Sequence, residues 1–94
     1  MREKLLKSLR YTLEDAENWL DVAKNENDEN WIDHMGQYLY NLGRVYQTAL
    51  ILQADYKENG KEVHAARNMR HNMYNDIATI QEIHQEEKRT CAPY

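Results

Sequence analysis

The sequence predicts an all-α protein, and three observations support this fold class. Glycine and proline are scarce, with three and one residues, and the only proline is Pro93. Apolar residues recur at alternating steps of three and four, which is the period of an amphipathic helix. Short polar segments at 24–30 and 57–60 separate the periodic stretches. We therefore expect three helices, at about 2–23, 28–57 and 61–88, and a flexible tail at 89–94.

The first periodic segment carries a single apolar stripe, formed by Leu6, Leu9, Leu13, Ala16, Leu20 and Ala23. Side chains at these steps share one face of a helix, so we expect this face to be buried. The following segment, 24–30, contains no apolar residue and is predicted to be a loop. Asn27 or Asp28 is the expected N-cap of the next helix, because their side chains can accept a hydrogen bond from its first amides.

The second segment carries two adjoining stripes. One consists of Ile32, Met35, Leu39, Leu42, Tyr46, Ala49, Gln53 and Tyr56, and the other of Trp31, Tyr38, Val45 and Leu52. So wide a face predicts contact with two neighbouring helices. Gly36 and Gly43 lie at its edge, and an interior glycine costs about 1 kcal/mol relative to alanine. We expect a neighbouring helix or a large ring to approach the backbone closely at these two positions.

The third segment follows Gly60, which suits the left-handed position at a helix end. Its apolar stripe comprises Val63, Ala66, Met73, Ile77 and Ile80, and is interrupted by Arg70 and His84. Because short loops make sequential helices antiparallel neighbours, we predict a single domain, 1–94, built as an up-down-up three-helix bundle. The central helix, roughly 45 Å long, exceeds what so small a core needs. Dimerisation or higher oligomerisation could bury the remainder.

Negative charge is concentrated in one part of the chain. Residues 14–33 hold eight carboxylates and one lysine, whereas the whole chain has a net charge of −4. One interpretation is a solvated surface; the other is a docking surface for a basic partner protein. The residues predicted to form that docking surface are Glu17, Asp21, Glu26, Asp28, Glu29 and Asp33.

Two further groups of residues could bind a partner or a ligand. His64, Arg67, His71 and Tyr74 share one face of the third helix, with Arg70 beside them, and such a face can hold a phosphate or stack a base. The alternative is an ordinary polar surface. On the second helix, Tyr40, Arg44 and Ile51 form a line on the outer face, which could be an interface or scattered exposed residues.

The sequence contains no motif for catalysis, for a cofactor or for a metal site. No His-x-x-x-His pair, glycine-rich phosphate loop or serine elbow is present, and the lone Cys91 has no histidine at motif spacing. A single cysteine favours a reducing compartment, and no apolar run approaches membrane-spanning length. We expect a cytoplasmic protein without a membrane partner. The pI near 5.5 disfavours nucleic acid as a partner.

These features favour a small non-enzymatic binding protein that contacts a partner protein through its acidic surface. One concrete form is a phage or mobile-element inhibitor of a host defence enzyme, of the anti-CRISPR or anti-restriction type. The alternative is a nucleotide or anionic-ligand binder, or sponge, that uses the third helix, with a site that could lie between subunits. A third interpretation is a helical dimeric enzyme, similar in length and architecture to AroQ-type chorismate mutases. Its helix lengths differ from theirs, and no residue-level motif supports it.

Overall fold

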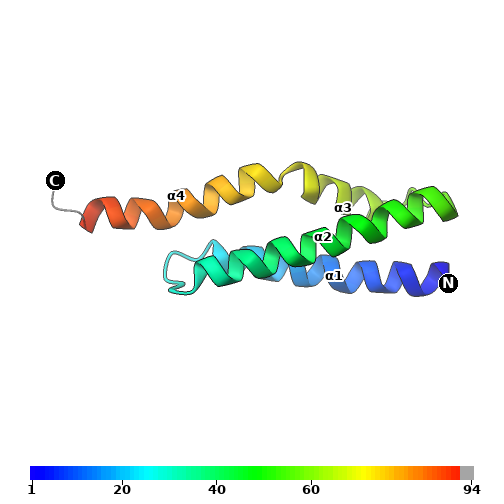
Figure 1. The fold of residues 1–94 in the computed structure, drawn as a ribbon, viewed down its shortest axis with the longest axis horizontal. Coiled ribbons are helices and arrows are strands. Elements are labelled where there is room, and N and C mark those ends of the chain that lie inside the picture. The colour runs from blue at the N-terminus through cyan, green and yellow to red at the C-terminus, as the bar shows by residue number, and fades with distance from the viewer. Residues whose placement is uncertain (92–94) are drawn as a thin grey trace.

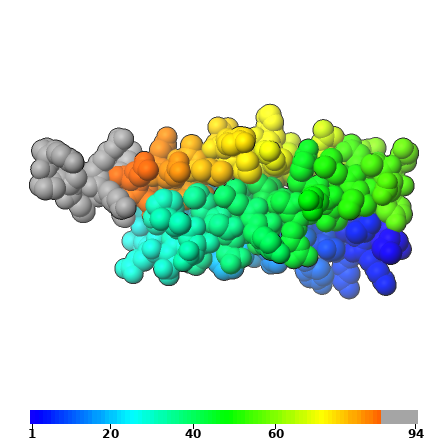
Figure 2. Space-filling view, viewed as in Figure 1, coloured from blue at the N-terminus to red at the C-terminus, as the bar shows by residue number. Residues whose placement is uncertain are grey.

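The computed structural model describes the backbone of residues 1–91 and the side chains of residues 1–85. It contains four helices: α1 (Arg2–Ala23), α2 (Trp31–Tyr56), α3 (Lys61–His71) and α4 (Met73–Cys91). The prediction of an all-helical chain is confirmed, since the described residues include no strand. In Figure 1, α2 runs back along α1, and α3 returns from the far end of α2, with α4 continuing in the same general direction. The result is an elongated molecule measuring 56 × 18 × 16 Å (Figure 2).

The core divides into two clusters along the α1–α2 pair. The first brings together three leucines of α1, three apolar residues of α2 and two of α3: Leu6, Leu9, Leu13, Val45, Ala49, Leu52, Val63 and Ala66. The second is centred on Ala16, Tyr38 and Leu42. Met69 packs against both clusters, so α3 joins them. Burying a side chain of leucine size stabilises the fold by about 1.5–3 kcal/mol, which makes these faces the main stabilising contacts.

The buried face of α2 differs from the predicted one. The second stripe supplies three fully buried residues, Tyr38, Val45 and Leu52, whereas Ile32 of the first stripe is 64% exposed. The prediction for the two interior glycines is wrong within the described chain. A Cβ atom added at Gly36 or at Gly43 would meet nothing within 4 Å, so no described helix or ring approaches them.

The segment 24–30 is a loop, as predicted, but the N-cap of α2 is Asn30 rather than Asn27 or Asp28. Two turns closed by side chains shape this loop. The amide of Asn27 donates to Asn25 Oδ1 at 3.0 Å, and the amide of Asn30 donates to Asp28 Oδ1 at 3.1 Å. Short polar side chains favour such local bonds over helix, and this explains why the chain turns here.

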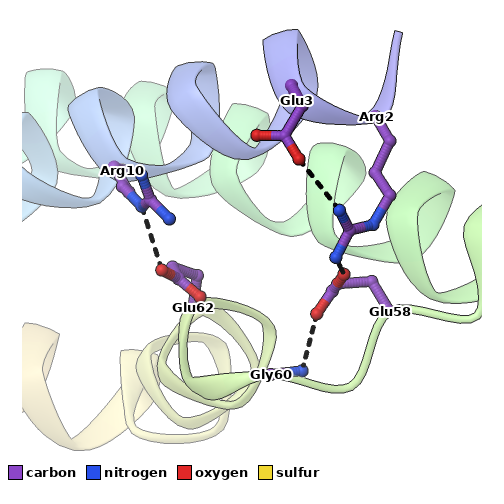
Figure 3. Close-up of polar contacts among 6 residues, drawn as sticks. All are labelled: Arg2, Glu3, Arg10, Glu58, Gly60 and Glu62. Carbon is purple, nitrogen blue, oxygen red and sulfur yellow. Dashed lines mark hydrogen bonds and ion pairs between the residues drawn. The ribbon is translucent and has the colours of Figure 1, made fainter.

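The turn between α2 and α3 also differs from the prediction. Lys57, not Gly60, takes the left-handed conformation, with φ 56°, and the amide of Glu58 donates to the carbonyl oxygen of Leu52 at 3.0 Å. Gly60 is extended and serves as the N-cap of α3. Two ion pairs connect α1 to this turn and to the start of α3. Arg2 contacts Glu58 in the turn, and Arg10 contacts Glu62 in the first turn of α3 at 2.9 Å (Figure 3).

The predicted third helix is divided at Asn72, which separates α3 from α4. Its φ of −88° and ψ of 0° lie outside the helical range, although its amide still donates to Asn68 and its carbonyl still accepts from Asp76. The chain therefore bends without losing its hydrogen bonds. α4 runs to Cys91, beyond the predicted helix end at 88, and residues 92–94 of the predicted tail lie outside the described residues.

Polar contacts connect α4 to the α1–α2 pair. His84 is only 5% exposed; its Nε2–H donates to the carbonyl oxygen of Ala23 at 2.7 Å, and its ring stacks on Trp31 with centroids 4.7 Å apart. Asp76 accepts a hydrogen bond from the Tyr38 hydroxyl at 3.4 Å and pairs with Lys24 at 3.5 Å. Burial, followed by the Asp76 carboxylate, raises the pKa of Tyr38, so this hydroxyl stays protonated and can donate.

Candidate functional site

An open hollow of about 660 Å³ lies at the bend between α3 and α4. Its lining residues come from three helices: Tyr46 of α2, four residues of α3 and Tyr74 of α4. The four from α3 are Arg67, Asn68, Arg70 and His71. Arg67, Arg70, His71 and Tyr74 follow helical spacing and stay on one surface across the bend at Asn72, where the backbone hydrogen bonds continue.

Arg70 lies near the centre of this group. Its guanidinium carbon is 5.9 Å from the ring centroid of Tyr46 and 5.8 Å from that of Tyr74. Both distances fall within the range of cation–π attraction. Arg70 is half-buried, whereas Tyr74 is 69% exposed. The two rings therefore hold the guanidinium in place, and the Tyr74 ring remains available to a ligand.

Electrostatically, the hollow is suited to an anion. Arg67, Arg70 and His71 line it, and no carboxylate of the described side chains is among its lining residues. Arg67 Nη1 donates to Gln53 Oε1 at 3.3 Å, which orients this side chain from the α2 side. Guanidinium groups bind phosphate or carboxylate oxygens through two parallel hydrogen bonds, and tyrosine rings stack on planar groups.

Two smaller hollows lie along α1, and they offer a comparison. Their volumes are about 500 and 420 Å³, and both contain Lys4 and Lys7. The first also includes Glu3 and Glu14, and the second includes Asp15. A neighbouring carboxylate opposes the binding of an anion, so these hollows fit one less well than the hollow at the α3–α4 bend.

The structure brings together four of the five anion-binding candidates from the sequence: Arg67, Arg70, His71 and Tyr74. His64 is exposed on α3 and does not line the hollow. Sequence reasoning missed Tyr46 and Asn68. Tyr46 belongs to an apolar stripe of the second helix, so its position in the sequence predicts burial in the core. Its polar hydroxyl was the one sign in the sequence that this side chain could instead lie at the edge of the buried face.

Five of the six predicted acidic docking residues are exposed, namely Glu17, Asp21, Glu26, Glu29 and Asp33. None of these five forms an ion pair with another side chain in the described range 1–85. Their charge therefore faces solvent at the end of the molecule where α1 meets α2.

Asp28, the sixth acidic residue, points inward. Its Oδ2 lies 2.6 Å from His34 Nδ1, and its side chain is only 10% exposed. The ring of His34 in turn lies 5.2 Å from that of Trp19. Burial acts to raise the pKa of Asp28, but hydrogen bonds from His34 and from the Asn30 amide outweigh it and lower the pKa below its usual value. The contacts of Asp28 are thus structural ones within the loop.

Tyr40, Arg44 and Ile51 are all exposed on α2, and Tyr40 has 65% of its surface accessible.

Within the described part of the chain, no group of three or more histidine, cysteine or acidic side chains is placed to hold a metal ion. Nor does any described helix combine the length and apolar character needed to cross a bilayer.

Comparison of the chain with models of protein families, with curated proteins and with solved structures found no match. Its function is therefore inferred from the geometry of its own residues.

Proposed function

We propose that this is a small non-enzymatic binding protein whose hollow at the α3–α4 bend takes an anionic ligand with a planar ring, such as a nucleotide. One observation carries the proposal: Arg67, Arg70, His71 and Tyr74 converge on one hollow that no described carboxylate lines. The volume of about 660 Å³ is within the range of small-ligand sites, roughly 300–1,000 Å³.

Each lining residue has a distinct role in this proposal. Arg67 and His71 bind the phosphate or carboxylate oxygens, and Arg70, held between two tyrosine rings, adds positive charge. The exposed ring of Tyr74 stacks on the base. Stacking of a base on an aromatic side chain contributes about 1–3 kcal/mol, so the ring and the cations together give affinity to an open site.

Thermal unfolding with a panel of mono-, di- and cyclic nucleotides tests this function. A ligand present at 100 times its Kd stabilises the folded state by about 2.7 kcal/mol, which raises Tm by roughly 10 °C or more in a chain of this length. Arg67→Ala and Arg70→Gln should abolish the shift. His64→Ala is the matched control, because His64 lies on α3 outside the hollow and should leave the shift intact. No shift with any nucleotide would reject the proposal.

A second candidate function is docking of the acidic end on a basic protein surface. It is supported by the five exposed carboxylates that make no ion pair within residues 1–85. A concrete form is a cytoplasmic inhibitor, from a phage or mobile element, of a host defence enzyme; small size and charge are its support. In this proposal the folded unit is an antiparallel up-down-up bundle, with α3 and α4 together forming its third arm.

Affinity capture from host lysate distinguishes this second candidate. We expect one stoichiometric partner that is lost when Glu26, Glu29 and Asp33 are replaced by lysine. The control replaces Glu3, Asp55 and Glu82, three exposed carboxylates elsewhere, and changes net charge equally. Asp28 is left unchanged because it binds His34. Equal capture by both triple variants would contradict specific docking through the acidic end.

A further inference from the structure

The outer face of α2 carries an uncharged stripe that no described part of the chain covers. Its members follow steps of four, three, four, three and four and are all exposed: Gly36, Tyr40, Gly43, Gln47, Leu50 and Ala54. Ile32 and Ile51, 64% and 44% exposed, lie beside it. These steps place all six residues on one face of the helix. In Figure 2, α2 (cyan to green) forms much of the surface facing the viewer.

The apolar residues of this stripe are unusual for a solvated helix face. Tyr40 and Leu50 are 65% and 42% exposed, and both lie between uncharged neighbours on the stripe. Together with Ile32 and Ile51, they place four large exposed apolar side chains on or beside one face of α2. At Gly36 and Gly43, where an added Cβ atom would meet nothing within 4 Å, a second backbone could approach closely.

Charge along the molecule indicates what covers the stripe. The acidic Glu26, Glu29 and Asp33 flank the start of α2, whereas the exposed Lys57 and Lys61 follow its end. The basic residues of the α1 N-terminus, which include Lys4 and Lys7, lie at that same end (Figure 1). At this end Glu58 and Glu62 pair with Arg2 and Arg10. The exposed lysines there outnumber the exposed carboxylates, which are Glu3 and Asp55. The molecule therefore has one acidic and one weakly basic end, with the uncharged stripe between them. A second copy in the opposite direction is complementary to it at both ends.

We propose that two copies of this chain pair through the outer faces of α2 in an antiparallel arrangement. In the register that sets Tyr40 across from Leu50 of the second copy, Gly43 lies across from Gln47, and Gly36 across from Ala54. The same register sets Asp33, in the first turn of α2, across from Lys57, the C-cap residue of α2. A parallel arrangement would instead place each acidic end beside another, which is repulsive. Arg44 borders the centre of the seam and extends to solvent.

Sedimentation velocity of the wild type and of Gly43→Leu tests the surface. The leucine extends from an open position and replaces a residue of low helix propensity, so the variant should fold at least as stably. It blocks close approach, and we expect the dissociation constant of the dimer to rise at least about tenfold. Ala65→Leu adds an exposed leucine on α3 and should leave the dimer unchanged. A wild type that stays monomeric at about 1 mM, or a dimer that Gly43→Leu leaves intact, would overturn the proposal.

Disulfide cross-linking tests the orientation. In a Cys91→Ser background, Asp33→Cys together with Lys57→Cys should form a covalent dimer under mild oxidation, whereas either substitution alone should not. Cross-linking of Asp33→Cys alone would instead indicate a parallel pair and would overturn the antiparallel arrangement.

Discussion

His84 is the buried polar residue through which α4 contacts the end of α1. Its Nε2–H donates to the Ala23 carbonyl, so the neutral ring must carry its proton on Nε2. His84→Ala leaves that carbonyl without its donor and removes the stacking partner of Trp31. We expect a loss of about 1–3 kcal/mol.

The loss at His84 should be local to α4. In His84→Ala, the hydrogen-exchange protection of α4 should fall relative to the wild type by more than the protection of α1 and α2 does. Gln81→Ala, an exposed substitution on the same helix, should have little effect on the protection of α4. Unchanged protection of α4 in His84→Ala would contradict the structural role of this residue.

Asp28 makes the free energy of unfolding depend on pH in the acidic range. Its pKa is lowered in the folded state, so it is deprotonated in the fold at pH values where the unfolded chain binds a proton. The stabilisation is fully present above the unfolded pKa of about 3.9 and is lost as pH falls through the lower folded value. Asp28→Asn should therefore lose less stability than the wild type between about pH 5 and pH 2, measured by urea unfolding.

Glu62 contributes in the same direction, because its own amide and then Arg10 lower its pKa. Some dependence on acid should thus remain in Asp28→Asn. Equal pH dependence in the variant and the wild type would show that the Asp28–His34 contact does not stabilise the fold.

At the scale of helices, the α2–α3 turn holds a residue poorly suited to its backbone. Lys57 has a φ of 56°, a region that costs residues other than glycine roughly 1–2 kcal/mol. Lys57→Gly should raise the free energy of unfolding by about 0.5–1 kcal/mol, since part of the gain is offset by a more flexible unfolded chain. Urea unfolding measures this, with Lys61→Gly, at a helical position, expected to lower stability instead. If Lys57→Gly is less stable than the wild type, the left-handed conformation of Lys57 is contradicted.

The helices themselves were largely predictable, because the period of apolar residues reports which faces are buried. The bend at Asn72 was not, since its backbone keeps both flanking hydrogen bonds and no glycine or proline marks it. A local signal existed: Arg70 interrupts the apolar stripe, and Asn68, Asn72 and Asn75 have low helix propensity. Spacing alone placed four hollow residues on one face and Tyr74 one turn from Arg70, but only the packing of α3 on α2 brings Tyr46 to the same arginine.

At the scale of the whole molecule, the separation of acidic and basic ends should govern self-association. If Asp33 faces Lys57 of a second copy, Asp33→Lys and Lys57→Asp should each weaken the dimer. The double variant should recover most of the affinity, because it exchanges the two charges. Sedimentation at low ionic strength, where surface charges are least screened, measures all three variants. Additive weakening in the double variant would contradict the pairing.

Binding of an anionic ligand in the hollow at the α3–α4 bend can be followed residue by residue in a two-dimensional NMR titration of the ¹⁵N-labelled protein with the nucleotide panel. We expect saturable shifts confined to Tyr46 and to residues 67–74, and their loss in Arg70→Gln with His64→Ala unaffected. Spectra that do not change with any nucleotide, or shifts that map to another surface, would contradict it.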